Sequence, residues 1–203
     1  MNEDNLPALT DVKEYYDISY KKYAVAMFHP VTTEYHDIKK TIKNFVDSLI
    51  ESQLNYIVIY PNNDLGSREI LEEYSRIQDN PRIKIFPSLR FEFFLALLKN
   101  AEFMIGNSSA GIREAPHFQV PSIDIGTRQN NRAYLNSIEH CDYDTKNILE
   151  TISKILNRKV KIINKNLEFG SGDSNILFAN ILRKKEFWDI SHQKQFQKIK
   201  TNE

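Results

Sequence analysis

The sequence has a single cysteine, no net charge and no long apolar run. Cys141 is the only cysteine among 203 residues, so an internal disulfide is excluded and a protein of the reducing cytoplasm is predicted. Lysine and arginine together number 27, and so do aspartate and glutamate. A chain with no net charge has no general attraction for nucleic acid or acidic membranes, so we expect neither as a partner.

Signals for membrane insertion, metal binding and common nucleotide motifs are also lacking. No apolar run approaches the roughly 20 residues that a membrane-spanning helix needs, and residues 1–17 are acidic and mixed, unlike a signal peptide. Four histidines have no partner at metal-ligand spacing, namely His36, His117, His140 and His192. The glycines do not form G-x-G-x-x-G, and no P-loop lysine follows them. We therefore expect neither a metal nor a cofactor.

The middle of the chain alternates short apolar runs with longer segments of helical periodicity. The apolar runs predict strands at residues 23–28, 55–60, 82–86, 102–106, 121–126 and 139–143. The other segments predict helices at residues 35–52, 67–79, 91–100, 110–118 and 145–156. This alternation indicates an α/β protein with a doubly wound, Rossmann-like parallel sheet. Ligands bind such sheets at the carboxyl ends of the strands.

The strongest candidate for chemistry is the loop after the fourth predicted strand, GNSSAGIRE at residues 106–114. The first N–H groups of a helix lack internal partners and attract anions, so a strand that runs through small residues into a helix can hold a phosphate. Ser108 and Ser109 add hydroxyl donors, and the carboxylate of Glu114 can accept two hydrogen bonds from a ribose diol. A plain helix cap by either serine is the alternative, and the residues alone leave both open.

Three further loops follow predicted strands at the same edge. His29 comes directly after the first strand, where a histidine can bind a diphosphate or donate a proton; a structural histidine in a turn is the alternative. Residues 61–67 can cap a helix or line a sugar or nucleotide pocket. Residues 126–132 carry Arg128 and Arg132, which suit phosphate contacts, although arginines are also common in solvated loops.

Taken together, these loops resemble the hydrolysing UDP-N-acetylglucosamine 2-epimerases of sialic and related nonulosonic acid pathways. Five ordered segments carry the resemblance: HPVTTEY, YPNNDLGSREI, FPSLRFEFFLALLKNAEFMIGNSSAGIREAP, VPSIDIGTRQNNR and FGSGDSN. The resemblance runs from about Tyr23 to Ile190. It implies a GT-B-type architecture, with two Rossmann-like domains and an active site between them. This chain would be the second domain, which holds most of the UDP.

The resemblance also implies a division of the chain. Residues 1–22 would be a linker or a truncated interdomain segment, and residues 23–165 the Rossmann-like UDP-binding domain. Residues 166–190 would form the C-terminal helix that crosses back to the first domain, and residues 191–203 a polar tail. The N-terminal domain would then be a missing partner. Without that domain the crossing helix is expected to be partly exposed or to mediate self-association, and a homodimer is one possibility that stays open.

Roles for individual residues come from the same resemblance. His29 would contact the diphosphate and help the leaving group, and Ser108 and Ser109 would bind phosphate. Glu114 would hold the ribose hydroxyls. Two further residues, Asn62 and Arg128, would complete the pocket, and backbone near Leu89 would meet the uracil. The ligands implied are UDP and a UDP-N-acetylhexosamine.

The implied reaction eliminates UDP from UDP-N-acetylglucosamine to give a 2-acetamidoglucal, to which water adds to give N-acetylmannosamine. The carboxylates that move the C2 proton are expected in the missing domain, so this chain alone should bind UDP without turnover. Three alternatives stay open. They are the same chemistry on a UDP-diacetamido-trideoxy sugar, one half of a GT-B glycosyltransferase, and a nucleotide-binding module without catalytic activity.

Overall fold

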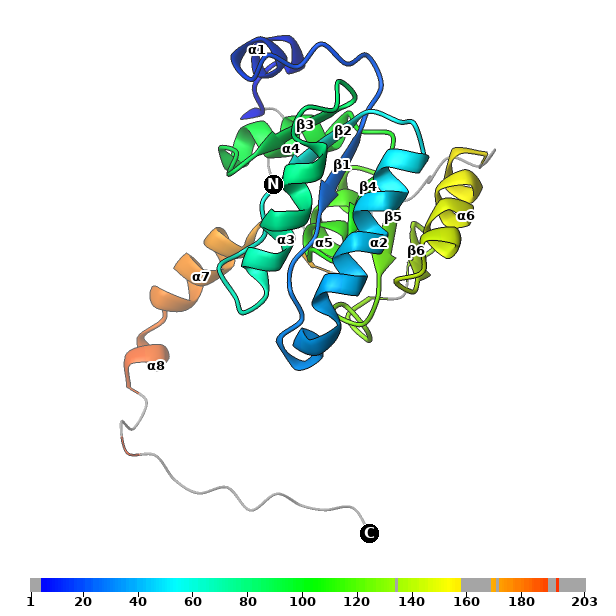
Figure 1. The fold of residues 1–203 in the computed structure, drawn as a ribbon. Coiled ribbons are helices and arrows are strands. Elements are labelled where there is room, and N and C mark those ends of the chain that lie inside the picture. Colours follow the sequence, from blue (N-terminus) through cyan, green and yellow to red (C-terminus); the bar gives the residue numbers. More distant parts are fainter. Residues whose placement is uncertain (1–4, 134, 158–168, 171, 190–192, 194–203) are drawn as a thin grey trace. The chain divides into compact units, whose positions relative to one another are not determined.

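The apolar runs of the sequence pair into one parallel sheet (Figure 1). The computed structural model describes residues 5–133, 135–157, 169–170, 172–189 and 193. The strands are β1 (Ala24–Met27), β2 (Tyr56–Ile59), β3 (Ile83–Phe86), β4 (Met104–Gly106), β5 (Ser122–Ile125) and β6 (Ile138–Cys141). They are ordered β3-β2-β1-β4-β5-β6, and every neighbouring pair is parallel. The predicted doubly wound, Rossmann-like sheet is therefore confirmed.

The strand order reverses between β1 and β4, which pair in the middle of the sheet. From β1 the chain proceeds outward to β2 and β3, then returns to β4 and proceeds to the opposite edge. Loops that leave the carboxyl ends of the two central strands diverge at such a reversal, and ligands of doubly wound sheets bind there. His29 lies in the loop after β1, and Ser108 and Ser109 lie in the loop after β4.

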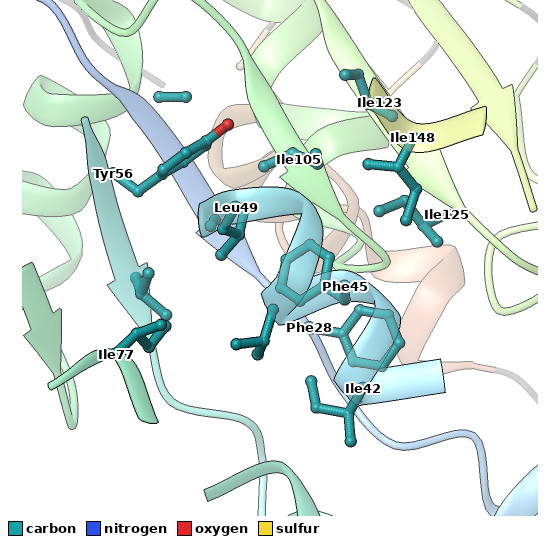
Figure 2. Packing of buried hydrophobic residues seen from close by; sticks show 14 of the residues in the cluster. Phe28, Ile42, Phe45, Leu49, Tyr56, Ile77, Ile105, Ile123, Ile125 and Ile148 are labelled. Atoms are coloured by element: carbon teal, nitrogen blue, oxygen red, sulfur yellow. The ribbon is translucent and has the colours of Figure 1, made fainter. Parts of the chain in front are cut away.

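One face of the sheet is covered by the helices α2 (Ile38–Glu51), α3 (Ser67–Tyr74) and α6 (Thr145–Leu156). The short 3-10 turns η2 (Thr32–Asp37) and η3 (Ser75–Ile77) precede α2 and follow α3. Figure 2 shows the packing of this layer, in which Phe45 of α2 lies against Phe28 with ring centroids 5.0 Å apart. Both phenylalanines are almost completely buried, so this contact anchors α2 beside the end of β1.

The other face is covered by the helices α1 (Leu9–Tyr15), α4 (Phe91–Lys99) and α5 (Ala110–His117). Five consecutive residues of α4, from Phe94 to Leu98, are buried, in keeping with the apolar sequence FEFFLALLK of this helix. Tyr23, directly before β1, connects the sheet to α4. Its hydroxyl donates a hydrogen bond of 2.8 Å to the carbonyl of Leu97. The two layers of helices enclose the sheet and leave its strand ends open for loops.

The segment before β1, expected to be a linker or a truncated interdomain segment, contributes to this second layer. Val12 of α1 is fully buried and Ile18 is 5% exposed, and both belong to the hydrophobic cluster that contains α4. Tyr16 packs edge-on against Phe86 at the end of β3, with ring centroids 5.1 Å apart. From Asn5 onward the described part of this segment is therefore integrated into the Rossmann-like domain.

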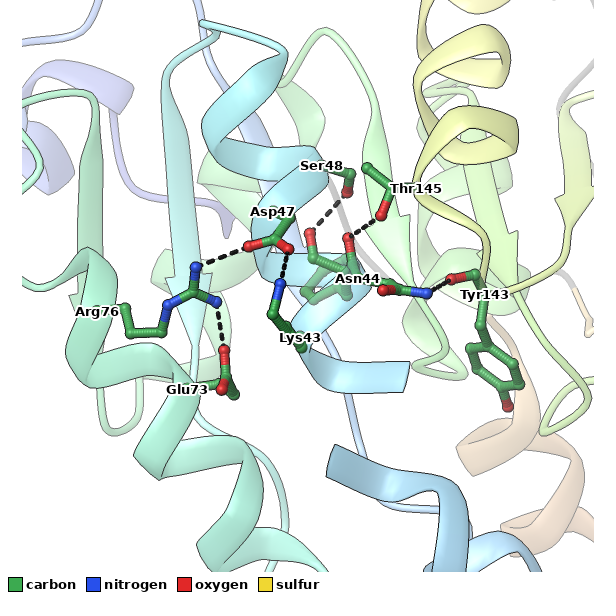
Figure 3. Close-up of polar contacts among 9 residues, drawn as sticks. Lys43, Asn44, Asp47, Ser48, Glu73, Arg76, Tyr143 and Thr145 are labelled. Atoms are coloured by element: carbon green, nitrogen blue, oxygen red, sulfur yellow. Dashed lines mark hydrogen bonds and ion pairs between the residues drawn. The ribbon is translucent and has the colours of Figure 1, made fainter. Parts of the chain in front are cut away.

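Polar contacts join α2 to its neighbours on the outer surface (Figure 3). Asp47 accepts hydrogen bonds from Lys43 at 2.5 Å and from Arg76 at 2.7 Å. On the other side of α2, the Asn44 side chain donates to the carbonyl of Tyr143 at 3.0 Å. These contacts fix α2 between η3 and the loop that follows β6.

The C-terminal helices form a separate compact unit. The family resemblance predicts one crossing helix within residues 166–190, but the described residues there form two helices, α7 (Ser174–Leu182) and α8 (Lys185–Trp188). The prediction of one continuous helix is therefore wrong, because Lys184 adopts an extended conformation (φ −79°, ψ 127°). Residues 158–168, at the predicted boundary between the UDP-binding domain and the crossing helix, lie outside the described residues, as does the predicted polar tail apart from residue 193. Within the described ranges, no helix combines the length and the apolar character needed to cross a bilayer.

Candidate functional site

A glycine brings the loop after β4 into contact with the end of β1. Gly106 has φ +133°, and a Cβ atom there would lie 2.0 Å from the carbonyl oxygen of Met27. No other residue fits such an approach, because both the positive φ and the contact exclude a side chain. The next residue, Asn107, then donates its backbone N–H to the same Met27 oxygen at 3.2 Å. The sequence GNSS therefore starts from a fixed position at the strand reversal.

Asn107 connects three loops at this edge of the sheet. The backbone N–H of His29 donates to its side-chain oxygen at 2.6 Å, and its amide nitrogen donates to the carbonyl of His29 at 2.8 Å. Its own carbonyl accepts from Arg128 Nη1 at 3.2 Å and from Gln129 Nε2 at 2.8 Å. Asn107 and Gln129 are both fully buried. The loops after β1, β4 and β5 therefore meet at a single asparagine.

The imidazole of His29 has a defined tautomer. Its Nδ1 atom accepts a hydrogen bond of 3.0 Å from the backbone N–H of Asn62, so the proton of the neutral ring lies on Nε2. Burial and the nearby Arg128 lower the pKa of His29 to about 4, while Asp64 opposes the shift. At neutral pH the ring is therefore uncharged and presents Nε2–H as a donor.

The two serines after β4 have different roles. Ser108 is 8% exposed, and its hydroxyl accepts a hydrogen bond of 3.3 Å from the N–H of Ala110. Ser109 occupies the N-cap position of α5 without a side-chain capping hydrogen bond and lines a pocket. The capping alternative therefore describes Ser108, whereas the position of Ser109 suits contact with a ligand.

A pocket of about 350 Å³ lies beside these loops. It is lined by Met27, Ile59, Pro87, Ser88, Leu89, Phe91, Phe94, Ser109, Ala110 and Glu114. Most of this wall is apolar, so it suits a planar ring, while Ser109 and Glu114 supply polar groups. Burial raises the pKa of Glu114, and the neighbouring Arg113 opposes that shift.

The sequence-predicted residues thus fall into two adjacent groups. Leu89, Ser109 and Glu114 share the pocket. His29, Asn62 and Arg128 belong to the hydrogen-bonded network around Asn107 and are absent from the residues that line the pocket. The loop from Gly106 to Ser109 joins the two groups. The arrangement offers an apolar recess with a carboxylate next to a cluster of donors for an anion.

Sequence reasoning missed Asn107 and Gln129 because buried amides in loops have no periodic signal. It also missed Glu34, whose carboxylate accepts hydrogen bonds from the hydroxyl of Thr127 and, at 2.9 Å, from that of Tyr143. Burial and the hydrogen bond to Glu34 raise the pKa of Tyr143 to about 12. Glu34 therefore ties η2 to the loop that carries Arg128.

Other reactive groups in the described part of the chain offer little chemistry. Burial raises the pKa of the Cys141 thiol to about 12, so this cysteine stays protonated at neutral pH. No group of three or more histidine, cysteine, aspartate or glutamate side chains that could hold a metal ion occurs among the described residues. The loops at the strand reversal are accordingly the best candidate for function.

Comparison with known proteins places most of the chain, including these loops, in a protein family. The family model for UDP-N-acetylglucosamine 2-epimerase matches residues 2–183. A UDP-N-acetylglucosamine 2-epimerase of Neisseria meningitidis serogroup B is 47% identical over 199 residues, which are 97% of this chain and 52% of that protein. A hydrolysing UDP-N,N'-diacetylbacillosamine 2-epimerase of Legionella pneumophila is 32% identical over 148 residues, covering 71% of this chain and 38% of the relative. The chain thus spans about half the length of the Neisseria relative, and its match to the Legionella relative covers 38% of that protein.

Solved structures support the fold. The chain superimposes on UDP-GlcNAc 2-epimerase of Methanocaldococcus jannaschii, solved in complex with UDP-GlcNAc and UDP, with a TM-score of 0.66. The match covers 85% of this chain and 48% of that one, at 20% sequence identity. At this identity the likeness shows the fold alone, a Rossmann-like domain of the GT-B type.

Proposed function

The chain belongs to the UDP-N-acetylglucosamine 2-epimerase family, and we propose that it is the UDP-binding half of a hydrolysing member. The whole enzyme would convert UDP-N-acetylglucosamine and water into N-acetylmannosamine and UDP. The observation that carries the proposal is the position of the pocket with Glu114 beside the donors His29 and Arg128 at the strand reversal. A nucleoside diphosphate needs such an apolar recess next to an anion site.

The nucleoside would occupy the pocket. Uracil would lie between Leu89, Phe91 and Phe94, whose side chains form an apolar wall, because aromatic and aliphatic surfaces bind a planar base. Glu114 would accept hydrogen bonds from the ribose hydroxyls. Ser109 stands at the N-cap position of α5, so it would meet the phosphate next to the ribose.

The diphosphate would extend from Ser109 toward the network around Asn107. His29 would donate from Nε2 and Arg128 from its guanidinium, which uses Nη1 for the carbonyl of Asn107. A diphosphate next to His29 would also favour the protonated ring, because an adjacent negative charge raises the pKa of an imidazole. His29 could then pass its proton to the departing UDP.

These contacts would serve the elimination step. In that step the bond between the sugar C1 and the UDP oxygen breaks, the bonding electrons leave with UDP, and the C2 proton goes to a base. Neutralising the negative charge on the departing diphosphate lowers the barrier. In the proposed assignment Glu114 is occupied by the ribose, so the base at C2 would come from the other half of the enzyme. We therefore expect this chain to bind UDP and to form no N-acetylmannosamine alone.

The same chemistry on a UDP-diacetamido-trideoxy sugar is the second candidate. Its support is the 32% sequence identity to the Legionella protein. It ranks second because the identity to the Neisseria protein is higher, at 47%. Both candidates use the same UDP pocket, because they differ only in the sugar. Turnover of each UDP-sugar by an enzyme completed with its other half would separate them.

The test of UDP binding is a calorimetric titration of UDP into the chain and into Glu114→Ala. Loss of charge-assisted hydrogen bonds is expected to weaken binding by about 1–3 kcal/mol. Glu51→Ala is the matched control, because Glu51 ends α2 and is exposed, next to the amino end of β2. Equal affinities for all three proteins would refute the role of Glu114, and no binding by the unmodified chain at millimolar UDP would refute the site.

A further inference from the structure

Asn107 pairs with His29 as one strand pairs with another. The register of β1 and β4 ends at Met27 and Gly106, and the strands separate beyond that pair. There the side chain of Asn107 bonds both the N–H and the carbonyl of His29, at 2.6 and 2.8 Å. The amide thus extends the hydrogen bonding of the sheet by one residue, which fixes the backbone of His29 relative to the loop after β4.

The backbone of Asn107 fixes the third loop. Its carbonyl accepts from both Arg128 and Gln129, and its N–H donates to Met27. Arg128 is therefore held by one guanidinium nitrogen, and the contacts described for it leave the other two for a ligand. His29 and Arg128 are thus both hydrogen-bonded to the same residue, Asn107.

We propose that Asn107 is a positioning residue that sets His29 and Arg128 in the one arrangement from which both reach the same diphosphate. The inference rests on the proposed function, because it assigns Asn107 to the anion half of the UDP site. Asn107 itself is fully buried and would not touch the ligand. It acts through the two donors that it aligns.

The state of the His29 ring distinguishes positioning from general stabilisation. His29 is partly buried against Arg128, which with burial lowers its pKa to about 4. If Asn107 holds His29 there, removing the amide releases the loop, and the pKa of His29 rises toward its ordinary 6.5. A residue that only stabilises the fold would lower the melting temperature and leave the ring of the folded chain unchanged.

The experiment compares Asn107→Ala with Asn55→Ala in the full chain. The Asn55 side chain donates to the carbonyl of Lys22 at 2.9 Å near the amino ends of β1 and β2, so it is a matched asparagine at the opposite edge. Two quantities are measured for each protein. They are the pKa of His29 from the NMR shift of its ring proton without ligand, and the dissociation constant for UDP.

Asn107→Ala is expected to raise the pKa of His29 and to weaken UDP binding roughly tenfold, the effect of losing about one aligned hydrogen bond, while Asn55→Ala changes neither. An unchanged pKa of His29 in folded Asn107→Ala overturns the inference. If Asn107→Ala does not fold, Asn107→Ser, which keeps a neutral hydroxyl for one of the two bonds, is measured in the same way. Absence of UDP binding by the unmodified chain would instead refute the proposed function. The two failures are distinguishable, because the pKa of His29 is measured without ligand.

Discussion

At the strand reversal, a few hydrogen bonds determine the tautomer of His29 and the different roles of Ser108 and Ser109. The sequence places His29 at the ligand edge, but it does not give the charge or tautomer of the ring. The N–H of Asn62 bonds Nδ1, and burial beside Arg128 keeps the ring neutral. Ser108 and Ser109 are similarly equivalent in sequence, yet one caps the next helix and the other faces the pocket.

The lowered pKa of His29 predicts a pH dependence of stability. Between pH 6.5 and about 4 the unfolded chain binds a proton at His29 that the folded chain does not. The stability that His29 contributes is therefore complete above pH 6.5 and is lost as the pH falls toward 4. Relative to a His29→Gln variant, the unmodified chain should lose about 2–3 kcal/mol between pH 7.5 and 4.5.

Urea unfolding at the two pH values measures this difference. His36→Gln is the control, because the His36 side chain is 79% exposed. It should follow the pH dependence of the unmodified chain. A His29→Gln variant with that same dependence would contradict a neutral, partly buried His29 ring.

A helix forms at its predicted residues where it has both an apolar face to bury and a capping residue at its start. α6 begins at Thr145 and ends at Leu156, as predicted, because Asp144 caps it and isoleucines line one face. The tail helix was predicted as one element and is two. α7 is apolar in composition, yet none of its residues is buried. Packing against a core therefore does not stabilise a longer helix here.

The N-cap of α6 can be tested directly. The Asp144 side chain accepts from the N–H groups of Lys146 and Asn147 at 3.0 and 3.2 Å. Asp144→Ala should lower the free energy of unfolding by about 1 kcal/mol, as measured by urea denaturation. Asp79→Ala, at an exposed position outside the helices, should change it by less than about 0.5 kcal/mol. Equal effects of the two substitutions would show that the cap is not formed.

At the scale of the whole molecule, the residues before β1 belong to the Rossmann-like domain. Every hydrophobic residue described as buried lies between Val12 and Ile155, and α1 supplies part of the layer that contains α4. The family resemblance implied a linker or a truncated interdomain segment at residues 1–22. The few apolar side chains among them become important only when α4 and β3 provide a surface to cover.

Val12 tests this integration. Val12→Ala should reduce the free energy of unfolding by about 1–3 kcal/mol, because it removes two methyl groups from a fully buried position. Leu65→Ala is the control, since Leu65 is 60% exposed and its truncation should change stability by no more than about 0.5 kcal/mol. Differential scanning calorimetry of the two variants measures both effects. A Val12→Ala variant as stable as the control would place α1 outside the folded core.

The amino-acid sequence was sufficient to predict the alternation of strands and helices, the parallel doubly wound sheet and the loops at its ligand edge. These features follow from local periodicity and from the rule that parallel strands end at one edge. Three features became visible in the folded chain: Asn107, Gln129 and Glu34 join the loops, the His29 ring is neutral, and α1 is part of the core. Such features depend on contacts between residues far apart in the chain, and no local pattern encodes the distance, burial or field that a folded neighbour imposes.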